Sequence, residues 1–438
     1  MDVTGTVSLY NLYAAKAWVD AAKDFHHSMT FPTYETALQP LIWYLTTSPS
    51  LPQYLSVIRS LTSSLAANVF SAGLCYQSSK KAVELSEQGW AVFWSQLICL
   101  CSPLNDIIEY GLAGRMLVDE FRCLTSAIHN AFDSPGPDQH GQVCHLILEL
   151  QDVVSNIQEF PGLSHFLLPS LFPGLQGTAK GGPIIVVNAS KYSCDVLIVL
   201  AGMDPVHVLL LITQANVWKL ISELQVLTVL AKKEDVMRDL GIILWELWDN
   251  VVFFIVNVLL QHVQHQSCIW WCPTADFSVL PLHVAGPYRK SQENLADMFI
   301  SSYTPTLSVL IHARGPSLPN PEMQVKQFIA IGQAEAPKQS KLHSVSIELA
   351  NIGQCIDGLA TFMHIEGQEV CISRVTDELS KNKWVHLACH GLPDKKQPFK
   401  SLFALYDGHL TIHHIIGCNF TMLCGLRNQG FLAAHTQV

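Results

Sequence analysis

The stretch that decides the fold is Trp384-Val385-His386-Leu387-Ala388-Cys389-His390-Gly391. The apolar run after Trp384 predicts a buried strand, and Gly391 predicts that this strand ends in a sharp turn. A histidine at the carboxyl end of a core strand lies where open α/β sheets bind ligands and carry out chemistry. His390 is therefore the first candidate for a functional residue.

Strand-like runs and helical patterns alternate before this stretch. Residues 269–272 and 328–332 are charge-free runs typical of strands, and residues 344–359 and 376–382 have helical periodicity. Alternation of this kind predicts a mainly parallel sheet covered by helices. We expect residues 385–388 to lie inside that sheet, flanked by the strands at 269–272 and 328–332.

Two further β-branched runs, at residues 184–187 and 196–200, flank Ser190-Lys191-Tyr192. They predict a pair of strands joined by a short turn, with a third strand at residues 206–211. Pro and Gly gather between residues 160 and 182, just before the first of these strands. We place a domain boundary there, because these residues interrupt regular structure.

The region before this boundary, residues 7–155, has the periodicity of helices. Two helix pairs suggest a degenerate repeat, since aromatic or small residues recur across each pair at a step of 16 positions. This spacing is similar to that of tetratricopeptide repeats, and an irregular helical bundle is the alternative. The positions are Trp18, Ala22 and Phe25 with Tyr34, Leu38 and Leu41, and Ala66, Phe70 and Gly73 with Ala82, Ser86 and Gly89.

The composition narrows the possible partners and compartment. Charged residues make up only 14% of the 438 residues, against about 25% in typical soluble chains. We therefore expect apolar surface that a protein or peptide partner, or a further piece of the fold, would cover. A net charge of −10 argues against nucleic acid as a partner.

The amino terminus lacks the basic and apolar regions of a signal peptide, and the 13 cysteines have no framework spacing. These features predict a cytoplasmic protein with reduced thiols, with the nucleus as the alternative compartment. The apolar stretch at residues 241–260 contains Glu246, Asp249 and Asn250, which are costly in lipid. We interpret it as a buried helix, so no membrane span is expected.

Six segments, taken together and in this order, resemble the CHAT domain, a caspase-like cysteine peptidase domain found with tetratricopeptide-type helices and here of the fungal type. The resemblance implies an α/β caspase-like fold, with a mainly parallel sheet flanked by helices, after an all-α region. The implied organisation is a tetratricopeptide-like region at residues 1–110, a helical connector at 111–175 and a CHAT domain at 176–438, incomplete after about residue 420. The segments are residues 183–195, 270–274, 280–286, 301–307, 385–391 and 402–412.

The resemblance also implies a Cys–His dyad that hydrolyses peptide bonds. His390 would be the general base and acid, and the backbone N–H of Gly391 would donate to the oxyanion. The family's nucleophile ends a second strand in Ser-Ala-Cys, and no such sequence follows His390. Cys424, 34 residues after His390, is the remaining candidate. Cys389 is interpreted as a core thiol, because neighbouring strand residues point to opposite faces.

No cofactor or metal ion is expected. Cys268 and Cys272 lack a second pair at zinc spacing, and the histidines at 409, 413 and 414 lack an acidic or thiolate partner. We therefore predict a CHAT-domain protein of cysteine peptidase ancestry that is inactive for want of the nucleophile strand. Two hypotheses stay open: a peptidase whose nucleophile lies elsewhere, and a catalytically dead scaffold that binds a partner through its helices.

Overall fold

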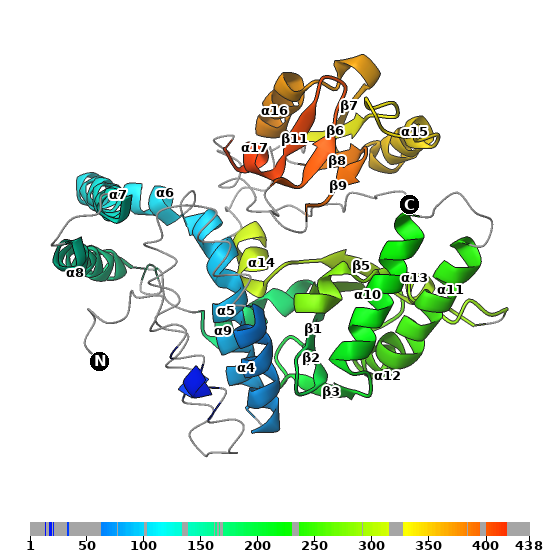
Figure 1. The fold of residues 1–438 in the computed structure, drawn as a ribbon, viewed down its shortest axis with the longest axis horizontal. Coiled ribbons are helices and arrows are strands. Elements are labelled where there is room, and N and C mark those ends of the chain that lie inside the picture. The colour runs from blue at the N-terminus through cyan, green and yellow to red at the C-terminus, as the bar shows by residue number, and fades with distance from the viewer. Residues whose placement is uncertain are drawn as a thin grey trace. The chain divides into compact units, whose positions relative to one another are not determined.

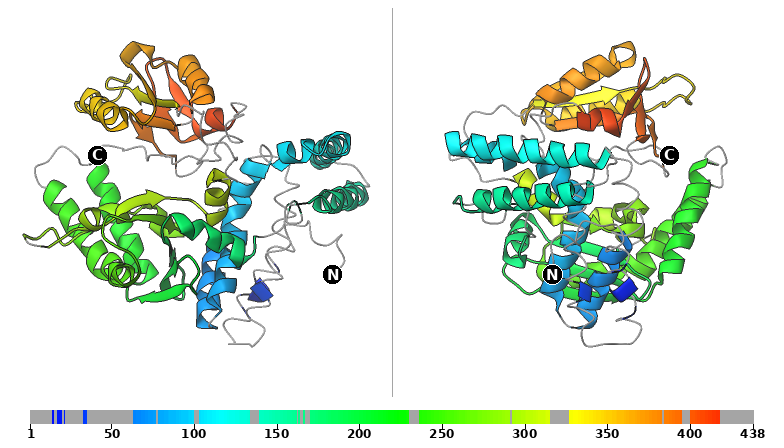
Figure 2. Two further views of the ribbon diagram at one scale, coloured as in Figure 1. Left: turned by 180° about the vertical axis from the view of Figure 1, so that it is seen from behind. Right: turned by 60° about the vertical axis from the view of Figure 1, so that its left-hand side comes forward.

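The computed structural model divides the chain into two compact units, Met1–Val309 and Leu310–Val438. Each unit has a sheet of its own, and helices lie along these sheets (Figures 1 and 2). The structure describes residues 14, 17–19, 21, 33–34, 63–76, 78–99, 103–133, 139–161, 163, 166, 170–229, 236–290, 292–314, 327–382, 384–394 and 400–417.

The described part of the predicted helical region is helical. α4 and α5 are neighbouring helices, and small buried residues, Ala66 on α4 and Ala82 and Ser86 on α5, accompany their packing. These are positions of the second predicted helix pair, whereas most of the first pair lies outside the described residues. The helices are α4 Ser63–Cys75, α5 Ser79–Cys99, α6 Pro103–Ile108, α7 Leu112–Asp133, α8 Gln139–Gln158 and α9 Phe172–Gln176, followed by the 3₁₀ turn η3 Gly177–Gly181.

The first unit contains a five-stranded mixed sheet in the order β3-β2-β1-β4-β5. The predicted pairing across Ser190-Lys191-Tyr192 is confirmed, because β1 and β2 run antiparallel from Ile184 opposite Val199 to Ala189 opposite Cys194. Both strands are buried along their whole length, as their β-branched composition predicts. The strands are β1 Ile184–Ala189, β2 Cys194–Val199, β3 Val206–Leu210, β4 Cys268–Pro273 and β5 Ile300–Tyr303.

Helices between β3 and β4 pack against this sheet. Leu247, Val251 and Ile255 are fully buried in the same apolar cluster as β1 and β2. The helices are α10 Gln214–Val229, α11 Val236–Leu247, a π-helical turn η4 Trp248–Val252 and α12 Phe253–His262. The connections after β4 and β5 contain η5 Ala275–Val279, η6 Leu282–Val284, α13 Leu295–Met298 and α14 Leu307–Arg314.

Within the described residues, one helical stretch, Val236–His262, is long enough and apolar enough to cross a membrane. Half of its most apolar window is buried inside the protein. The core helix of a soluble protein meets the same criteria of length and composition, so the finding is weak evidence for a membrane span.

Glu87 joins α5 to α14, 220 residues later in the chain. Its buried carboxylate accepts the backbone N–H of Ser308 at 2.7 Å and that of Leu307 at 3.1 Å. N–H groups in the first turn of a helix have no partner within the helix and carry partial positive charge. A second buried contact joins α4 to β2, where the Ser71 hydroxyl donates to Asp195 at 2.8 Å. The described helices α4 and α5 therefore belong to the same unit as the first sheet.

The second unit has a parallel sheet in the order β7-β6-β8, with α15 packed on one face and α16 on the other (Figure 1). A small antiparallel sheet, β11-β10-β9, follows β8. The strands are β6 Gln327–Gly332, β7 Thr361–Glu366, β8 Trp384–Ala388, β9 Gly391–Leu392, β10 Leu402–Ala404 and β11 His409–Thr411. The helices are α15 Val345–Ile356, α16 Ile372–Lys381 and α17 Ile412–Gly417, with a 3₁₀ turn η7 Gly367–Glu369.

One predicted pairing is wrong. β8 pairs with β6, as expected, but β4 belongs to the first unit's sheet, between β1 and β5. Within the described residues, β8 is an edge strand of its sheet and β6 is central, so residues 385–388 do not lie inside the sheet as expected. An apolar run indicates that a strand is buried without specifying its neighbour, and the alternating, partly exposed β7 has too weak a pattern to reveal the central place of β6.

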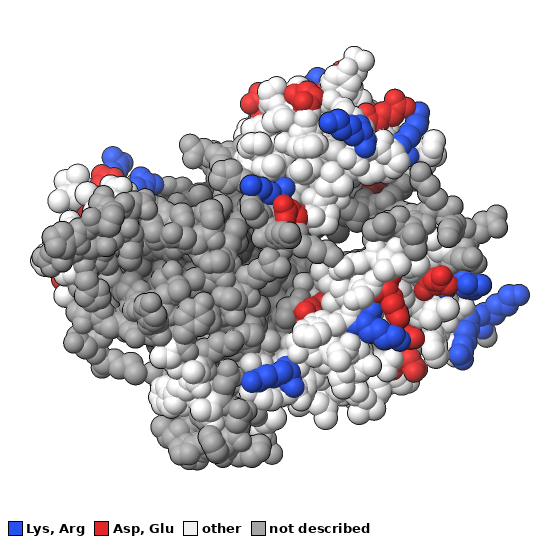
Figure 3. All heavy atoms as spheres, in the orientation of Figure 1, with Lys and Arg blue, Asp and Glu red and all other residues white. Residues whose placement is uncertain are grey.

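The described surface carries few charges, as the composition predicts. On the face drawn in Figure 3, Lys, Arg, Asp and Glu side chains are scattered between larger uncharged areas. Many large apolar side chains are exposed, among them Leu112, Leu211 and Met237.

Glu87 gives the folded chain a testable dependence on pH. Burial raises the pKa of Glu87 above its ordinary value of 4.5, and the N–H groups of Ser308 and Leu307 offset part of the rise. The folded chain therefore binds this proton more tightly than the unfolded chain. The protonated Glu87 side chain thus stabilises the folded chain below about pH 4.5. This stabilisation is lost as the pH rises through the pKa of Glu87 in the folded state.

We expect Glu87→Gln, which does not ionise, to remove this loss. In urea unfolding between about pH 5 and about pH 8, the free energy of unfolding of the variant relative to the parent should then shift in the variant's favour as the pH rises. Glu120→Gln, an exposed change on α7, is the matched control. A difference between variant and parent that does not change with pH would contradict the buried carboxyl assignment.

Candidate active site

β8 brings His390 to the carboxyl edge of the second unit's parallel sheet. The end of the strand is anchored to β6, because the N–H of Gln333 donates to the Ala388 carbonyl at 2.9 Å. Two residues later, the His390 carbonyl accepts the N–H of Ala404 at 2.9 Å, and Gly391 begins β9 opposite Phe403. The backbone is thus held on both sides of His390, whose side chain stays partly accessible.

The His390 imidazole is oriented by the loop between β6 and α15. Its Nε2 lies 2.7 Å from the carbonyl oxygen of Ser340. A carbonyl oxygen only accepts hydrogen bonds, so Nε2 carries the hydrogen, and in the neutral ring Nδ1 carries the lone pair. This arrangement leaves Nδ1 able to accept a proton, which is the requirement for a general base.

Cys389, next to His390, cannot supply the nucleophile. Its side chain is buried, and burial, reinforced by the Glu348 carboxylate, raises the pKa of the thiol to about 12. The nucleophile of a cysteine peptidase is the thiolate, which this environment disfavours at neutral pH. The structure thus places Cys389 in the core, as expected from the alternation of strand residues.

The other members of the predicted dyad site remain predictions. Gly391 follows His390 directly, at the start of β9, but its role as an oxyanion donor depends on a bound substrate. Cys424 lies outside the described residues, so its distance from His390 is not defined. The described residues therefore contain the histidine half of the predicted site.

A buried pair that the sequence did not reveal joins β8 to α15. On β8, His386 Nε2 is 2.7 Å from Oε1 of Glu348 on α15, and both side chains are largely buried. The pair ties β8 to the helix that follows the Ser340 loop, so it helps to position that loop against His390. His386 and Glu348 are 38 residues apart, and neither belongs to a motif that would have paired them.

Another thiol, Cys371, occupies the N-cap position of α16. A hydrogen bond with the Ser373 hydroxyl and a second with the backbone N–H of Arg374 lower the pKa of Cys371. A thiol at a helix N-terminus is a recognised setting for thiolate formation, but no motif in the sequence around Cys371 marks it as one. Its hydrogen-bonded neighbour is Ser373 and not His390.

Cys268 and Cys272, which are not expected to bind zinc, lie in different surroundings. Cys272 on β4 is buried, and burial raises its thiol pKa well above the ordinary value. Cys268, at the other end of the same strand, is exposed. In the part of the chain that the structure describes, no group of three or more His, Cys, Asp or Glu is placed to hold a metal ion.

The parallel sheet β7-β6-β8, flanked by helices and with a histidine at the carboxyl end of β8, agrees with the sequence resemblance, and residues 244–426 match the family model of the CHAT domain. The chain carries a CHAT domain. The match includes His390, Gly391 and Cys424, whereas the hairpin at residues 183–195 precedes the matched residues. No curated protein matches the chain.

We predict that the His386–Glu348 pair stabilises the CHAT domain more than its exposed ion pairs do. Glu348→Ala leaves a buried imidazole without its partner and should lower the free energy of unfolding by about 3 kcal/mol. Glu369→Ala, which breaks the exposed pair with Arg374, should cost less than about 1 kcal/mol. Denaturant unfolding of the single variants and of the His386→Ala/Glu348→Ala double variant measures the coupling energy.

Equal costs for Glu348→Ala and Glu369→Ala would show that the buried pair does not hold β8 to α15.

Proposed function

We propose that this CHAT-domain protein descends from cysteine peptidases, retains the histidine of the Cys–His dyad and has lost peptide-bond hydrolysis. The observation that carries the proposal is the surroundings of His390. Its ring is oriented as a base by Ser340, yet no cysteine among the described residues hydrogen-bonds to it. The adjacent thiol of Cys389 is buried and held in its protonated form.

Acyl transfer needs a thiolate within hydrogen-bond reach of the histidine, about 3 Å away. Cys424 would have to supply it from Met422-Leu423-Cys424-Gly425, which lacks the Ser-Ala-Cys pattern and the preceding β-branched run of the family's nucleophile strand. The unpaired edge of β8 within the described residues is where a further strand would add to the sheet. The proposal is that the residues after α17 do not bring a reactive thiol to that edge.

We expect residues 1–438 to cleave no peptide library and a peptidyl electrophile to label Cys424 no faster than an ordinary exposed thiol. The measurements are peptide cleavage followed by mass spectrometry and the labelling rate of the parent chain compared with Cys424→Ala. Cys355→Ala, an exposed cysteine on α15, is the control for ordinary thiol labelling.

Cleavage by the parent chain that both His390→Ala and Cys424→Ala abolish would establish the alternative, an active cysteine peptidase with Cys424 as nucleophile. If the cleavage survives Cys424→Ala but not Cys371→Ala, the nucleophile is the N-cap thiol of α16. Either result would refute the proposed loss of activity.

The activity that we propose in place of hydrolysis is protein binding by the helical region, in the cytoplasm. The described helices support it, because α7 exposes Leu112 and Met116, with 77% and 63% of their surface accessible. Exposed apolar side chains close together on a helix are typical of surfaces that bind other proteins. The paired helices α4 and α5, which carry the repeat-like positions, support a tetratricopeptide-like architecture for this region.

A further inference from the structure

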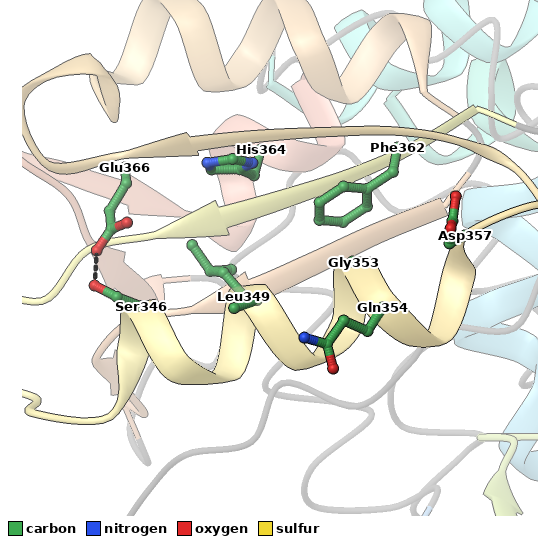
Figure 4. Close-up of a pocket in the computed structure, with 9 residues that line it drawn as sticks. Ser346, Leu349, Gly353, Gln354, Asp357, Phe362, His364 and Glu366 are labelled. Carbon is green, nitrogen blue, oxygen red and sulfur yellow. Dashed lines mark hydrogen bonds between the residues drawn. The ribbon is translucent and has the colours of Figure 1, made fainter.

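A groove of about 370 Å³ lies between α15 and the edge strand β7 in the second unit (Figure 4). Leu349 of α15 and Phe362 of β7 form its apolar part, and Gly353 leaves space beside the Phe362 ring. A Cβ at position 353 would come within 3.0 Å of that ring, so the absence of a side chain there shapes the floor of the groove.

The strand that borders the groove has unpaired backbone groups. Within the described residues, β7 pairs only with β6. In a parallel strand every second residue directs its N–H and C=O toward the same side, so the outer edge of β7 offers hydrogen bonds to an added strand. Peptides that bind sheet edges use these backbone groups for affinity and neighbouring pockets for specificity.

The charges of the groove are at its two ends. Asp357 lies beyond the last turn of α15, and Glu366, hydrogen-bonded to the Ser346 hydroxyl, lies at the carboxyl end of β7 (Figure 4). None of the nine residues that line the groove is Lys or Arg, and the histidine among them, His364 of β7, stacks on the Phe362 ring. A ligand with positive charge at both ends and an apolar centre is therefore complementary to the groove.

The spacing of the two carboxylates follows from the length of α15, which borders the groove. The helix from Ser346 to Asp357 rises about 16 Å, at about 1.5 Å per residue. Four residues of an extended peptide span about 13 Å, and residues i, i+2 and i+4 of a strand face the same side. The carboxylates thus suit basic residues at i and i+4, with an apolar residue at i+2 facing Leu349 and Phe362.

We propose that this groove binds an extended segment of a partner protein by adding it to β7, and that the segment carries Lys or Arg at positions i and i+4 and an aliphatic residue at i+2. The recognition site lies on α15 and β7 and does not involve the helical region. It goes beyond the proposed loss of hydrolysis and does not depend on the state of His390.

The test uses the full chain and three fluorescein-labelled peptides with Gly-Ser flanks. The first contains Arg-Thr-Leu-Thr-Arg, the second Glu-Thr-Leu-Thr-Glu, and the third Arg-Thr-Leu-Arg-Thr, which turns one arginine to the opposite face. Fluorescence anisotropy should show that the first binds about tenfold more tightly than the second, since each exposed ion pair changes affinity by up to about fivefold. It should bind the third several-fold more weakly than the first.

Charge reversal provides the decisive variant. Asp357→Lys/Glu366→Lys should reverse the preference between the Arg and Glu peptides, because both changed residues line the groove at its ends. Asp377→Lys, an exposed change on α16 at the opposite face of the sheet, should leave the preference unchanged. Gly353→Leu should weaken binding of the Arg peptide by filling the floor, while circular dichroism shows the fold retained.

Three results would overturn the proposal: equal binding of the Arg and Glu peptides, a preference that survives the double charge reversal, or no binding of any peptide. A change in oligomeric state on Gly353→Leu without an effect on peptide binding would show that a second copy of the chain occupies the groove instead.

Discussion

The parallel pairing of β8 with β6 is the interaction on which the candidate active site depends. The register places Gly332 opposite Ala388, and the next residue along β6 donates to the Ala388 carbonyl. Both strands therefore end at the same level, and the loop that leaves β6 passes beside the residue that follows β8. Because of this, the carbonyl of Ser340 meets the imidazole of His390. A parallel sheet gathers its carboxyl ends at one edge, which is why distant segments can form a site there.

Buried polar contacts hold the pieces of each unit in place around this framework. Glu87 binds the first turn of α14, Asp195 accepts the Ser71 hydroxyl, and His386 binds Glu348. A buried polar group without its partner costs far more than a surface group, so each contact favours one packing of helix on strand over its alternatives. Burial also determines the state of Cys389, because a thiol among buried groups stays protonated.

In the candidate site His390 is oriented as a base, and the described residues bring no nucleophile to it. Orientation of His390 depends on neighbouring backbone, which the CHAT domain supplies from the loop between β6 and α15 and from β10. Nucleophilic chemistry requires a thiolate beside His390, and the thiol with a lowered pKa among the described residues, Cys371, is the N-cap residue of α16, after β7. In the sheet, β6 separates β7, the strand that precedes Cys371, from β8, the strand that precedes His390.

The sequence by itself determined the strands β1, β2, β4, β6 and β8, the helices between them and the place of His390 at a strand end, because the hydrophobic period and a terminal glycine are local signals. It also carried the CHAT resemblance, which the family model confirms for residues 244–426. Only the tertiary structure decided that β4 and β8 belong to different sheets, that Ser340 orients His390, and that Glu348 pairs with His386. These relations join residues tens of positions apart through strand order and helix packing, and neither composition nor periodicity specifies which strand a buried strand will have as its neighbour.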